Sequence, residues 1–444
     1  MIANWTTAPI AKLTEKVGSG ATPRGGEAAY TLSGTPLIRS MNVVFFGFKR
    51  DGLAFIDDYQ ASALDGATVR ANDILLNITG ASIGRVTLAP HDMDGARVNQ
   101  HVCIIRPNTC IDSRYFRAYL SSPALQSKIW ADNTGTTRQA LTKQQILAFE
   151  VPIPPLAEQR RIADKLDTML ARIAAMNCRL ARVGPLLKRF RQSVLAAATS
   201  GKLTERWRTQ MNAPSWSITT VDTVAAVGTG STPLRSNTDF FAAIGVPWIT
   251  SAATGQSLVT TATENVTDLA IAVHRLKRYP VGTLLVAMYG EGKTRGQVSE
   301  LGIEATINQA CAAIVVDESR MLRSFVKLAL RANYLQMRDL AEGGNQPNLN
   351  LSKIKAFPLP APSMDEQAEI VRRVEFLFTY VDRLEARLQA AQSATERLTP
   401  SLLAKAFRGE LVPQDPTDES SNELLRRQAA AAPETAKRGK KVTA

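Results

Sequence analysis

One stretch of the sequence has the residue types and spacing of a nucleotide-binding loop. A strand-like segment at 284–286 leads into residues 287–294, which read Ala-x-x-x-x-Gly-Lys-Thr, a relaxed Walker A pattern. In such a loop Lys293 contacts the phosphates and Thr294 binds Mg²⁺. A phosphate-binding loop opens a helix, but glycines follow here, and too few residues remain before the strand-like segment 314–318. We therefore favour a glycine-rich turn that approaches a phosphate chain, and keep a P-loop NTPase as the least favoured alternative.

The sequence lacks the patterns of other kinds of catalysis. It contains no Asn-Pro-Pro-aromatic motif of an adenine methyltransferase, no glycine-rich loop for S-adenosylmethionine, no nuclease carboxylate cluster and no Ser-His-Asp arrangement. The three histidines have no partner at metal-ligand spacing, and the four cysteines include no C-x-x-C pair. This cysteine usage favours reduced thiols in a cytosol over a zinc site or disulfides. We expect a binding protein that is not an enzyme and holds no cofactor or metal itself.

The charge balance points to a polyanionic partner. Lys and Arg number 53 against 40 Asp and Glu, which gives a net charge of +13 and a pI near 9.7. Such an excess favours nucleic acid first. The N-terminus shows no signal-peptide pattern, and no apolar run is long enough to span a membrane. We expect a soluble, cytoplasmic protein whose 444 residues form several cores.

Basic and amide side chains in the glycine turns, and in the loops before two Pro-rich segments, are the candidates for DNA contact. Such side chains bind phosphate oxygens and base edges. The alternative for each is a solvated surface residue. The candidates are Arg24, Arg39, Arg85, Arg138 and Gln139 in the first half of the chain, and Arg235, Lys293, Arg295, Asn345 and Gln346 in the second.

These candidates are positioned by a block that the chain contains twice. Residues 141–203 return as residues 349–411 without insertion or deletion. Glu158 corresponds to Glu366, since 366 − 158 = 208, and Gly201 corresponds to Gly409 at the same offset of 208. A repeat of this size indicates a tandem duplication of one module.

Each copy of the block predicts one long helix. Apolar residues recur at spacings of three and four after a Pro-rich segment, and each pattern ends at a glycine suited to a left-handed cap. We expect the two helices to pack on each other as a coiled-coil-like pair, with a kink or short break at Pro185 and at Pro400. If they run antiparallel, roughly 44 residues at ~1.5 Å each would separate the two heads by up to about 60 Å. Two ordinary core helices in separate domains are the alternative.

The segments before the helices predict two heads of mixed α/β structure, so the fold class is α+β. Short strands alternate with Gly/Pro turns, including Gly-x-Gly-x-Thr-Pro at 18–23 and again at 228–233. The turns recur in both heads, whereas the segments between them differ. Residues from 412 onward read as a flexible basic tail.

At the duplicated block the chain resembles the specificity subunits of type I restriction–modification systems. The resemblance covers about residues 1–420. Departures are modest: Ser363 replaces Pro155 in the second copy, and Pro185 lies inside the first helix. The segments that carry the resemblance are 152–162 with 193–203, 360–370 with 406–411, and the glycine turns at 18–23, 228–233 and 290–296.

The resemblance implies a division of the chain into five segments. These are a first target recognition domain at 1–155, a first conserved helix at 156–205, a second recognition domain at 212–362, a second conserved helix at 363–411 and the tail at 412–444.

The resemblance also implies the function. Each recognition domain is expected to read half of a bipartite, asymmetric site on double-stranded DNA, and the helices are expected to set the spacer. Two modification subunits, adenine methyltransferases that bind S-adenosylmethionine, are expected to dock on the helices, and two restriction subunits that use ATP and Mg²⁺ complete a bacterial or archaeal enzyme. Alternatives are a stand-alone DNA-binding architectural protein and a coiled-coil scaffold that never contacts DNA. The residues expected to dock the modification subunits are Glu158, Gln159, Ile162, Glu366, Gln367 and Ile370.

Overall fold

The computed structural model describes residues 4–131, 140–289, 294–339 and 349–431. The contacts divide the chain into two compact units. The first unit combines Met1–Leu180 with Ala390–Ala444, and the second is Ala181–Gln389. Each unit therefore holds one head together with parts of both long helices, and the predicted α+β fold is confirmed.

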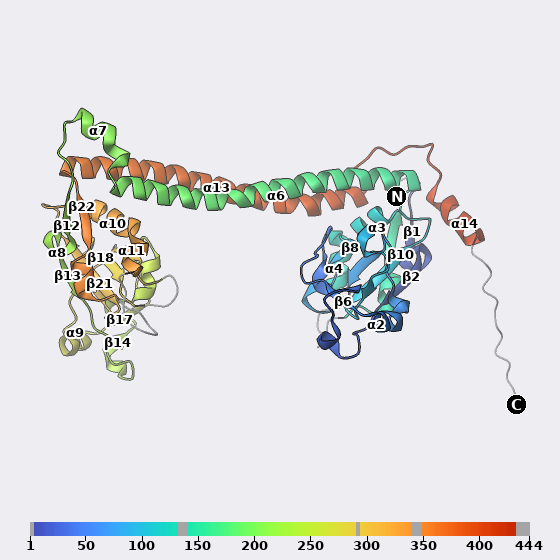
Figure 1. Ribbon diagram of the computed structural model, residues 1–444, viewed down its shortest axis with the longest axis horizontal. Coiled ribbons are helices and arrows are strands. Elements are labelled where there is room, and N and C mark those ends of the chain that lie inside the picture. Colours follow the sequence, from blue (N-terminus) through green and yellow to red (C-terminus); the bar gives the residue numbers. More distant parts are fainter. Residues whose placement is uncertain (1–3, 132–139, 290–293, 340–348, 432–444) are drawn as a thin grey trace. The chain divides into compact units, whose positions relative to one another are not determined.

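The two long helices are antiparallel. Helix α6 spans Leu156–Thr199 and α13 spans Met364–Phe407, 44 residues each, and they lie side by side (Figure 1). In the first unit the start of α6 shares a core with the end of α13, and in the second unit the end of α6 shares a core with the start of α13. Representative members are Ile162 and Leu403 in the first core, and Val194 and Ile370 in the second.

The predicted glycine caps are confirmed, and of the kink or short break predicted at each proline, the break is wrong. Gly201 and Gly409 adopt φ of +78° and +71°, the left-handed conformation that ends a helix at low cost. Pro185 and Pro400, however, lie inside continuous helices. Leu187 and Leu402, each two residues beyond a proline, are buried. Their packing stabilises the helix near the proline, which removes one backbone hydrogen bond.

The first head contains a four-stranded sheet in the order β2-β10-β7-β8, a three-stranded sheet in the order β6-β3-β9, and the hairpin β4-β5. The strands are β1 Thr6–Pro9, β2 Thr14–Ser19, β3 Thr35–Ile38, β4 Val43–Val44, β5 Gly47–Phe48, β6 Ala54–Ile56, β7 Ile74–Asn77, β8 Val86–Leu88, β9 Arg97–Val98, β10 Val102–Pro107 and β11 Glu150–Ile153. The helices are α1 Ile10–Leu13, α2 Asp58–Ala63, α3 Ser113–Leu120, α4 Pro123–Ala131 and α5 Lys143–Ala148.

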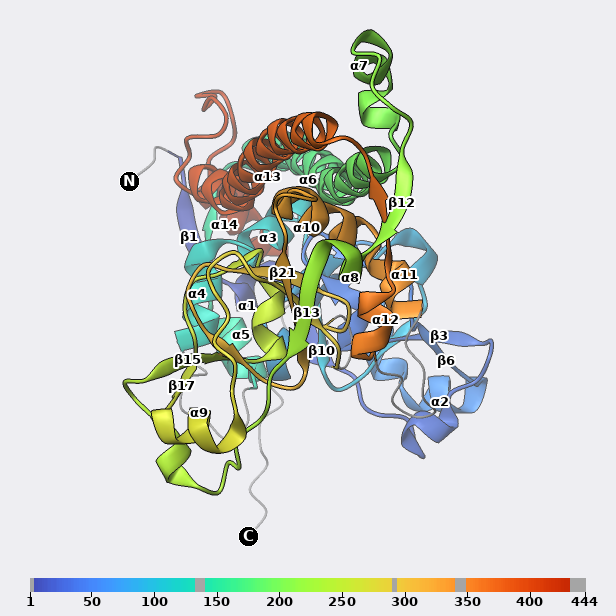
Figure 2. The ribbon, with the colours of Figure 1, turned by 90° about the vertical axis from the view of Figure 1, so that its left-hand side faces the viewer.

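The second head repeats this plan with a five-stranded sheet, β13-β21-β18-β19-β16, and a four-stranded sheet, β14-β17-β15-β20. Helix α10 lies between the sheet and the long helices (Figure 2). The strands are β12 Ser217–Thr220, β13 Ala225–Thr229, β14 Phe241–Ala242, β15 Val246–Ile249, β16 Leu258–Val259, β17 Glu264–Val266, β18 Leu284–Ala287, β19 Val298–Leu301, β20 Thr306–Ile307, β21 Cys311–Val316 and β22 Pro358–Ala361. The helices are α7 Glu205–Gln210, α8 Val221–Val224, α9 Asp268–His274, α10 Arg323–Ala332, α11 Tyr334–Asp339 and α12 Leu351–Lys355.

In both heads the strand that enters pairs with the strand that leaves. β1 runs antiparallel to β11, with Thr6 opposite Ile153, and β12 runs antiparallel to β22, with Ser217 opposite Ala361. Each long helix begins a few residues after such a pair. The pair therefore ties both ends of a head to the start of its helix.

The Gly-x-Gly-x-Thr-Pro turns serve packing inside each head. A Cβ atom on Gly20 would lie 1.7 Å from the carbonyl oxygen of Val98, and one on Gly230 would lie 1.6 Å from that of Ile307. No side chain fits at that distance, so only glycine allows the two segments to meet. The motif is thus explained by the fold of the head.

The tail is not flexible throughout, which corrects the prediction for 412–444. Residues Ser421–Ala431 form helix α14, and Leu424 is buried against the first head. The hydroxyl of Ser421 donates to the carbonyl of Asn4 at 2.7 Å, and Arg161 pairs with Asp418 at 2.6 Å. These contacts bind the segment to the first unit. Residues 432–444 lie outside the described residues.

Candidate nucleic-acid interface

A tryptophan–glutamate pair joins each head to its helix. The indole Nε1 of Trp5 donates to Oε2 of Glu158 at 3.1 Å, and Nε1 of Trp216 donates to Oε2 of Glu366 at 2.9 Å. Both carboxylates lie in the first turn of a long helix and are buried. The duplication therefore preserves a polar contact between head and helix, since a buried carboxylate requires hydrogen-bond partners.

The glutamine that follows makes a second joint. Oε1 of Gln159 accepts from the backbone N–H of Asp112 at 2.8 Å, and Oε1 of Gln367 accepts from that of Leu322 at 2.8 Å. The amide nitrogen of each glutamine donates to backbone carbonyls of its own module. The start of α3 and the start of α10 are thereby fixed to the long helices.

The burial of these side chains corrects the predicted docking residues. All six have at most 1% of their surface exposed, and they are engaged inside their own module. They cannot offer a partner a contact surface. The repeated sequence at these positions reflects the attachment of each head to its helix. The six residues are Glu158, Gln159, Ile162, Glu366, Gln367 and Ile370.

The pKa values of the two glutamates are shifted in opposite directions. Burial raises the pKa of Glu158, whose Oε1 has no hydrogen-bond partner within the described part of the chain. Burial also opposes ionisation of Glu366, but hydrogen bonds from Arg208, Thr204 and Trp216 outweigh it and hold the pKa of Glu366 below its usual value. Glu366 therefore forms an ion pair with Arg208 at 2.8 Å, whereas no such pair with Glu158 is found among the described residues.

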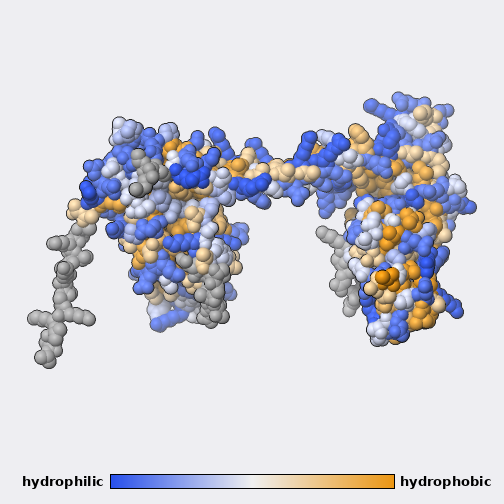
Figure 3. Space-filling view, turned by 180° about the vertical axis from the view of Figure 1, so that it is seen from behind, coloured by the Kyte–Doolittle hydropathy of each residue, from blue (hydrophilic) through white to orange (hydrophobic). Residues whose placement is uncertain are grey.

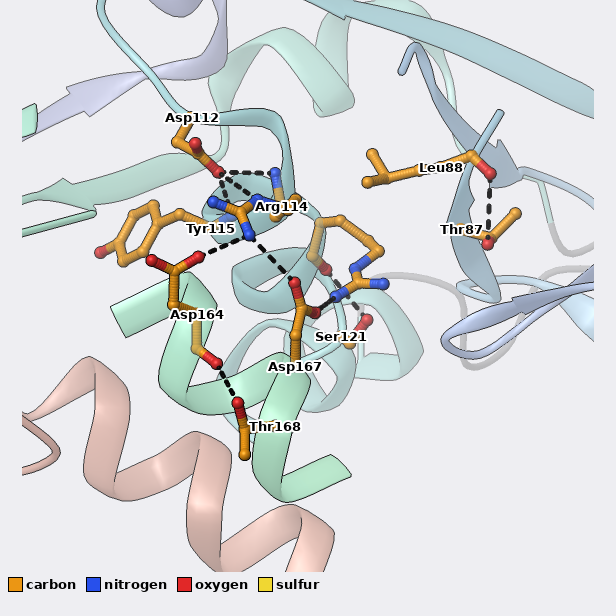
Figure 4. Close-up of polar contacts among 10 residues, drawn as sticks. Thr87, Leu88, Asp112, Arg114, Tyr115, Ser121, Asp164, Asp167 and Thr168 are labelled. Atoms are coloured by element: carbon orange, nitrogen blue, oxygen red, sulfur yellow. Dashed lines mark hydrogen bonds and ion pairs between the residues drawn. The ribbon is translucent and has the colours of Figure 1, made fainter. Parts of the chain in front are cut away.

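Charged side chains attach α3 of the first head to α6 (Figure 4). Arg114 contacts Asp164 at 2.7 Å and Asp167 at 3.3 Å, and Arg117 contacts Asp167 at 2.8 Å. Arg117 also stacks over Phe46, with its guanidinium carbon 5.0 Å from the ring centroid. We call this group the α3–α6 ion-pair cluster. Sequence reasoning missed it, because nothing in the spacing relates α3 to the first turns of α6.

The glycine turn of the first head forms an exposed, polar concavity. It follows β7, and Arg85 at its end is exposed and lines the hollow together with Thr79, Ser82 and His101. Nδ1 of His101 lies 2.6 Å from Oγ1 of Thr79. The turn thus presents a cation, hydroxyls and an imidazole to solvent. These are groups that hydrogen-bond to phosphates and base edges.

The corresponding turn of the second head is a hairpin and not a phosphate-binding loop. β18 and β19 are antiparallel, and the turn between them contains Gly296 with φ of +81°. β18 is also antiparallel to β21, the strand that precedes Asp317. A P-loop needs a helix directly after its glycines, so the nucleotide-binding alternative loses its structural basis.

The described candidates for DNA contact fall into three groups: exposed arginines, arginines that are hydrogen-bonded within their own head, and one half-buried arginine. Arg24 and Arg85 are exposed. Arg39 and Arg235 are occupied: Arg39 donates to the carbonyl of Gly52 at 2.6 Å, while Arg235 forms two hydrogen bonds with Glu264 at 2.6 and 2.9 Å.

Arg295 is half-buried at the β18–β19 turn. Arg39 and Arg235 also lie over aromatic rings, Arg39 over Tyr30 and Arg235 over Phe241 and Trp248. These internal contacts occupy both arginines in this structure, and their contact with DNA stays a prediction. The remaining candidates, Arg138, Gln139, Lys293, Asn345 and Gln346, lie outside the described residues.

The described residues contain no group of three or more His, Cys, Asp and Glu that could hold a metal ion. Burial raises the pKa of the Cys103 and Cys311 thiols to about 12, which keeps both protonated and unreactive. None of the described helices has the length and apolar character to cross a membrane. Apolar side chains gather on the second head in the view of Figure 3.

The sequence matches the family described as type I restriction modification DNA specificity domain over residues 58–183 and 215–391. Among curated proteins, the chain is 27% identical to the EcoKI specificity subunit of Escherichia coli strain K12, with 92% of this chain and 90% of that protein covered. It is 26% identical to the StySPI specificity subunit of Salmonella potsdam at the same coverage. It is 32% identical to the EcoDI specificity subunit of Escherichia coli over 65% of this chain and 68% of that one.

Two solved structures share the fold. One, from work on complex assembly and conformational transition of the type I R-M system, has a TM-score of 0.70 at 18% identity and covers 91% of this chain and 98% of that chain. The other, the HsdS subunit from Thermoanaerobacter tengcongensis, has a TM-score of 0.61 at 17% identity and covers 92% and 98%. At these identities the likeness supports the arrangement of heads and helices alone.

Proposed function

Because the chain belongs to the type I restriction modification DNA specificity family, we propose that it is the DNA specificity subunit of a type I restriction–modification enzyme and is not itself catalytic. One observation carries the proposal: the chain contains one module twice, with conserved joints and different head surfaces. A protein that reads two different half-sites needs this combination. The curated relatives covered over most of their length are all named specificity subunits.

Each head reads one half of a bipartite, asymmetric site on double-stranded DNA. In the first head the polar hollow around Arg85 and His101 faces the duplex, since it combines a cation with hydrogen-bonding groups at an exposed turn. In the second head the turn that ends at Gly296 has the corresponding position. The two turns differ in length and composition, so the two half-sites differ.

The long helices set the spacer and dock two modification subunits. S-adenosylmethionine is bound by those subunits, and two restriction subunits with ATP and Mg²⁺ add cleavage; the complex works in the cytoplasm. The surface that fits a partner is the exposed stripe of α13 that contains Phe376 and Tyr380, which are 71% and 56% exposed. Aromatic and Arg side chains dominate interface energetics, and Arg372 and Arg383 flank the two rings on the same face.

The spacer role can be tested by lengthening both helices. Seven residues inserted after Leu180 and seven after Gln389 keep the apolar stripe in register, because seven residues are about two helical turns. The helices grow by ~10 Å at ~1.5 Å per residue, about three base pairs at ~3.4 Å. Mapping of methylated adenines in cells that carry the modification partner should show the same half-sites around a longer spacer.

Exchange of the second head gives the reciprocal control. Replacing residues 215–361 by the second head of a relative should change one half-site and leave the spacer unchanged. Altered half-site bases after helix insertion, with the original spacer, would contradict the proposed division of roles. Methylation of DNA by the purified chain without partners would contradict the non-catalytic assignment.

A further inference from the structure

Each unit has a groove where the head meets the long helices, and the two grooves are built from equivalent elements. In the first unit the wall comprises the glycine turn with Arg85, residues of α4 and the end of α13. In the second unit it comprises the glycine turn with Gln297, residues of α10 and α11, and the end of α6. Gly84 and Gly296 mark the same point in the two turns. Their N–H groups close back onto the last residue of the preceding strand, Asn77 and Ala287, at 2.9 Å in both cases.

The side chains in the two grooves differ in kind. The first groove is mainly apolar, with Phe45, Phe46, Trp130, Pro400 and Leu403 among its lining residues. Its one cation among the described lining residues is Arg85. The second groove contains three cations, Lys188, Arg331 and Arg338, together with the amides of Gln192, Gln256 and Gln297.

Two of the three cations replace residues of different charge in the first module. Lys188 corresponds to Glu396 at the offset of 208. Leu322 and Asp112 make the same contact with the helix glutamine, an offset of 210, so Arg331 corresponds to Ser121. The second module has thus gained positive charge at both positions.

The carboxylates around the second groove leave part of this charge uncompensated. The guanidinium of Arg331 makes one contact, a long hydrogen bond of 3.4 Å to Oγ of Ser257. Arg191, behind it, is paired with Asp382 and Glu385. Desolvation is the larger cause that lowers the pKa of Arg331, and the nearby charge of Arg191 adds to it.

The adjoining recess differs in its charge balance. Arg323 and Lys327 share the carboxylate of Glu300, at 3.2 and 2.9 Å, and Glu375 also lines this recess. Arg331 lines this recess as well, so three cations face two carboxylates among its described lining residues. The surplus is larger in the groove with Lys188 and Arg331, whose described lining residues include no carboxylate, and hydroxyl and amide donors surround the cations there.

We propose that this groove of the second unit binds phosphate groups of the DNA backbone, a contact that the apolar groove of the first unit does not make. The proposal rests on the proposed function and makes it more specific. Arg, Lys, Ser and amide side chains are the residues that bind DNA phosphates. The helices would thereby share in DNA binding beside the second half-site, and the two halves of the site would be held by different forces.

The test replaces two cations of the second groove by the residues found at the equivalent positions of the first unit. Arg331→Ser and Lys188→Glu are combined in the full chain, with Lys188→Gln in place of Lys188→Glu as a milder form. Binding to a mixed-sequence duplex of about 40 base pairs is measured at several salt concentrations, because a phosphate contact acts on every sequence. Each lost contact lowers the slope of log affinity against log salt by about 0.9. We expect a decrease of about 1.8 for the double variant.

Two controls accompany the double variant. Arg278→Ser removes an arginine of the second head that pairs with Asp268 at 3.0 Å outside the groove, and should leave the slope unchanged. Glu396→Lys makes the reciprocal charge change at the position of α13 that corresponds to Lys188. Circular dichroism melting establishes that each variant is folded. For the double variant, ethylation interference on a mapped DNA site should no longer detect phosphate contacts beside the second half-site, while the contacts elsewhere remain.

The outcomes of this test distinguish failure of the phosphate site from failure of the proposed function. An unchanged slope in a folded double variant would overturn the phosphate site while leaving the specificity function intact. If the double variant bound DNA normally but no longer assembled with the modification partner, the groove would bind an acidic protein surface. That outcome would also overturn the phosphate site. If the unaltered chain bound no DNA, or gave no methylated DNA motif together with its modification partner, the proposed function itself would be contradicted.

Discussion

The two heads are attached to the same helices by different forces. In the first module the α3–α6 ion-pair cluster joins Arg114 and Arg117 to Asp164 and Asp167. At the corresponding place in the second module, Lys327 turns to Glu300 of its own head, and a recess remains between α10 and α13. The second head is held there mainly by apolar packing.

The buried glutamates show the opposite distribution. Glu366 has Arg208 and Thr204 as partners, whereas the positions equivalent to these two residues in the first module are Pro416 and Val412. Each module therefore has one strong electrostatic joint, placed at the helix start in the second module and along α3 in the first. Duplication has preserved the uncharged Trp and Gln contacts and allowed the charged ones to diverge.

The largest expected difference is between Glu366→Gln and Glu158→Gln. Glutamine keeps an oxygen for the indole N–H but loses the charge that Arg208 and Thr204 require. We expect Glu366→Gln to cost about 2–3 kcal/mol, because it leaves a charged partner without its buried counter-ion. Glu158→Gln should change stability by less than about 1 kcal/mol, since Glu158 has no cationic partner to lose. Urea denaturation followed by tryptophan fluorescence measures both.

The same pair of variants should differ in pH dependence. The depressed pKa of Glu366 contributes stability that is present above its ordinary value of 4.5 and lost as pH falls through the folded-state pKa. The raised pKa of Glu158 contributes stability that is present below 4.5 and lost as pH rises through its folded-state pKa. The deficit of Glu366→Gln should therefore shrink on acidification, while any gain from Glu158→Gln should be largest near neutral pH. Equal pH profiles for the two variants would contradict the opposite directions of the two pKa shifts.

A smaller difference is expected between Asp167→Asn and Glu375→Gln, which occupy equivalent positions. Asp167 contacts both arginines of α3, and the side chain of Arg117 is only 10% exposed. We expect Asp167→Asn to cost about 1–2 kcal/mol, as a partly buried charge loses its partner. Glu375→Gln should have an effect near zero, because Glu375 is exposed. Hydrogen exchange of α3 and α10 peptides would localise the loss to the first head, and equal effects would show that the cluster is unimportant.

The sequence predicted the helices well and the site residues only partly. Apolar spacing, the glycine caps and the 208-residue offset are signals in the sequence itself, so the length and mutual packing of α6 and α13 followed from them, whereas their antiparallel direction came from the family resemblance. The Glu-Gln motif was visible too, but whether it faces a partner or its own head depends on tertiary packing. The same limit applies to Arg39 and Arg235, whose partners Gly52 and Glu264 lie 13 and 29 residues away. A basic residue in a turn does not reveal whether the fold has already supplied its acceptor.

The smallest expected effects concern two arginines that looked alike in the sequence. Arg85 is exposed at the glycine turn of the first head, while Arg235 is held by Glu264, which is itself kept ionised by that arginine through a lowered pKa. Arg85→Ala should weaken binding of a mixed-sequence duplex by roughly tenfold or less and lower the salt slope by about 0.9. Arg235→Ala should leave the slope unchanged and alter stability little, as for other exposed ion pairs. If Arg235→Ala lowered the slope as much as Arg85→Ala, Glu264 would have to release Arg235 when DNA binds, and the distinction between occupied and available arginines would fail for the second head.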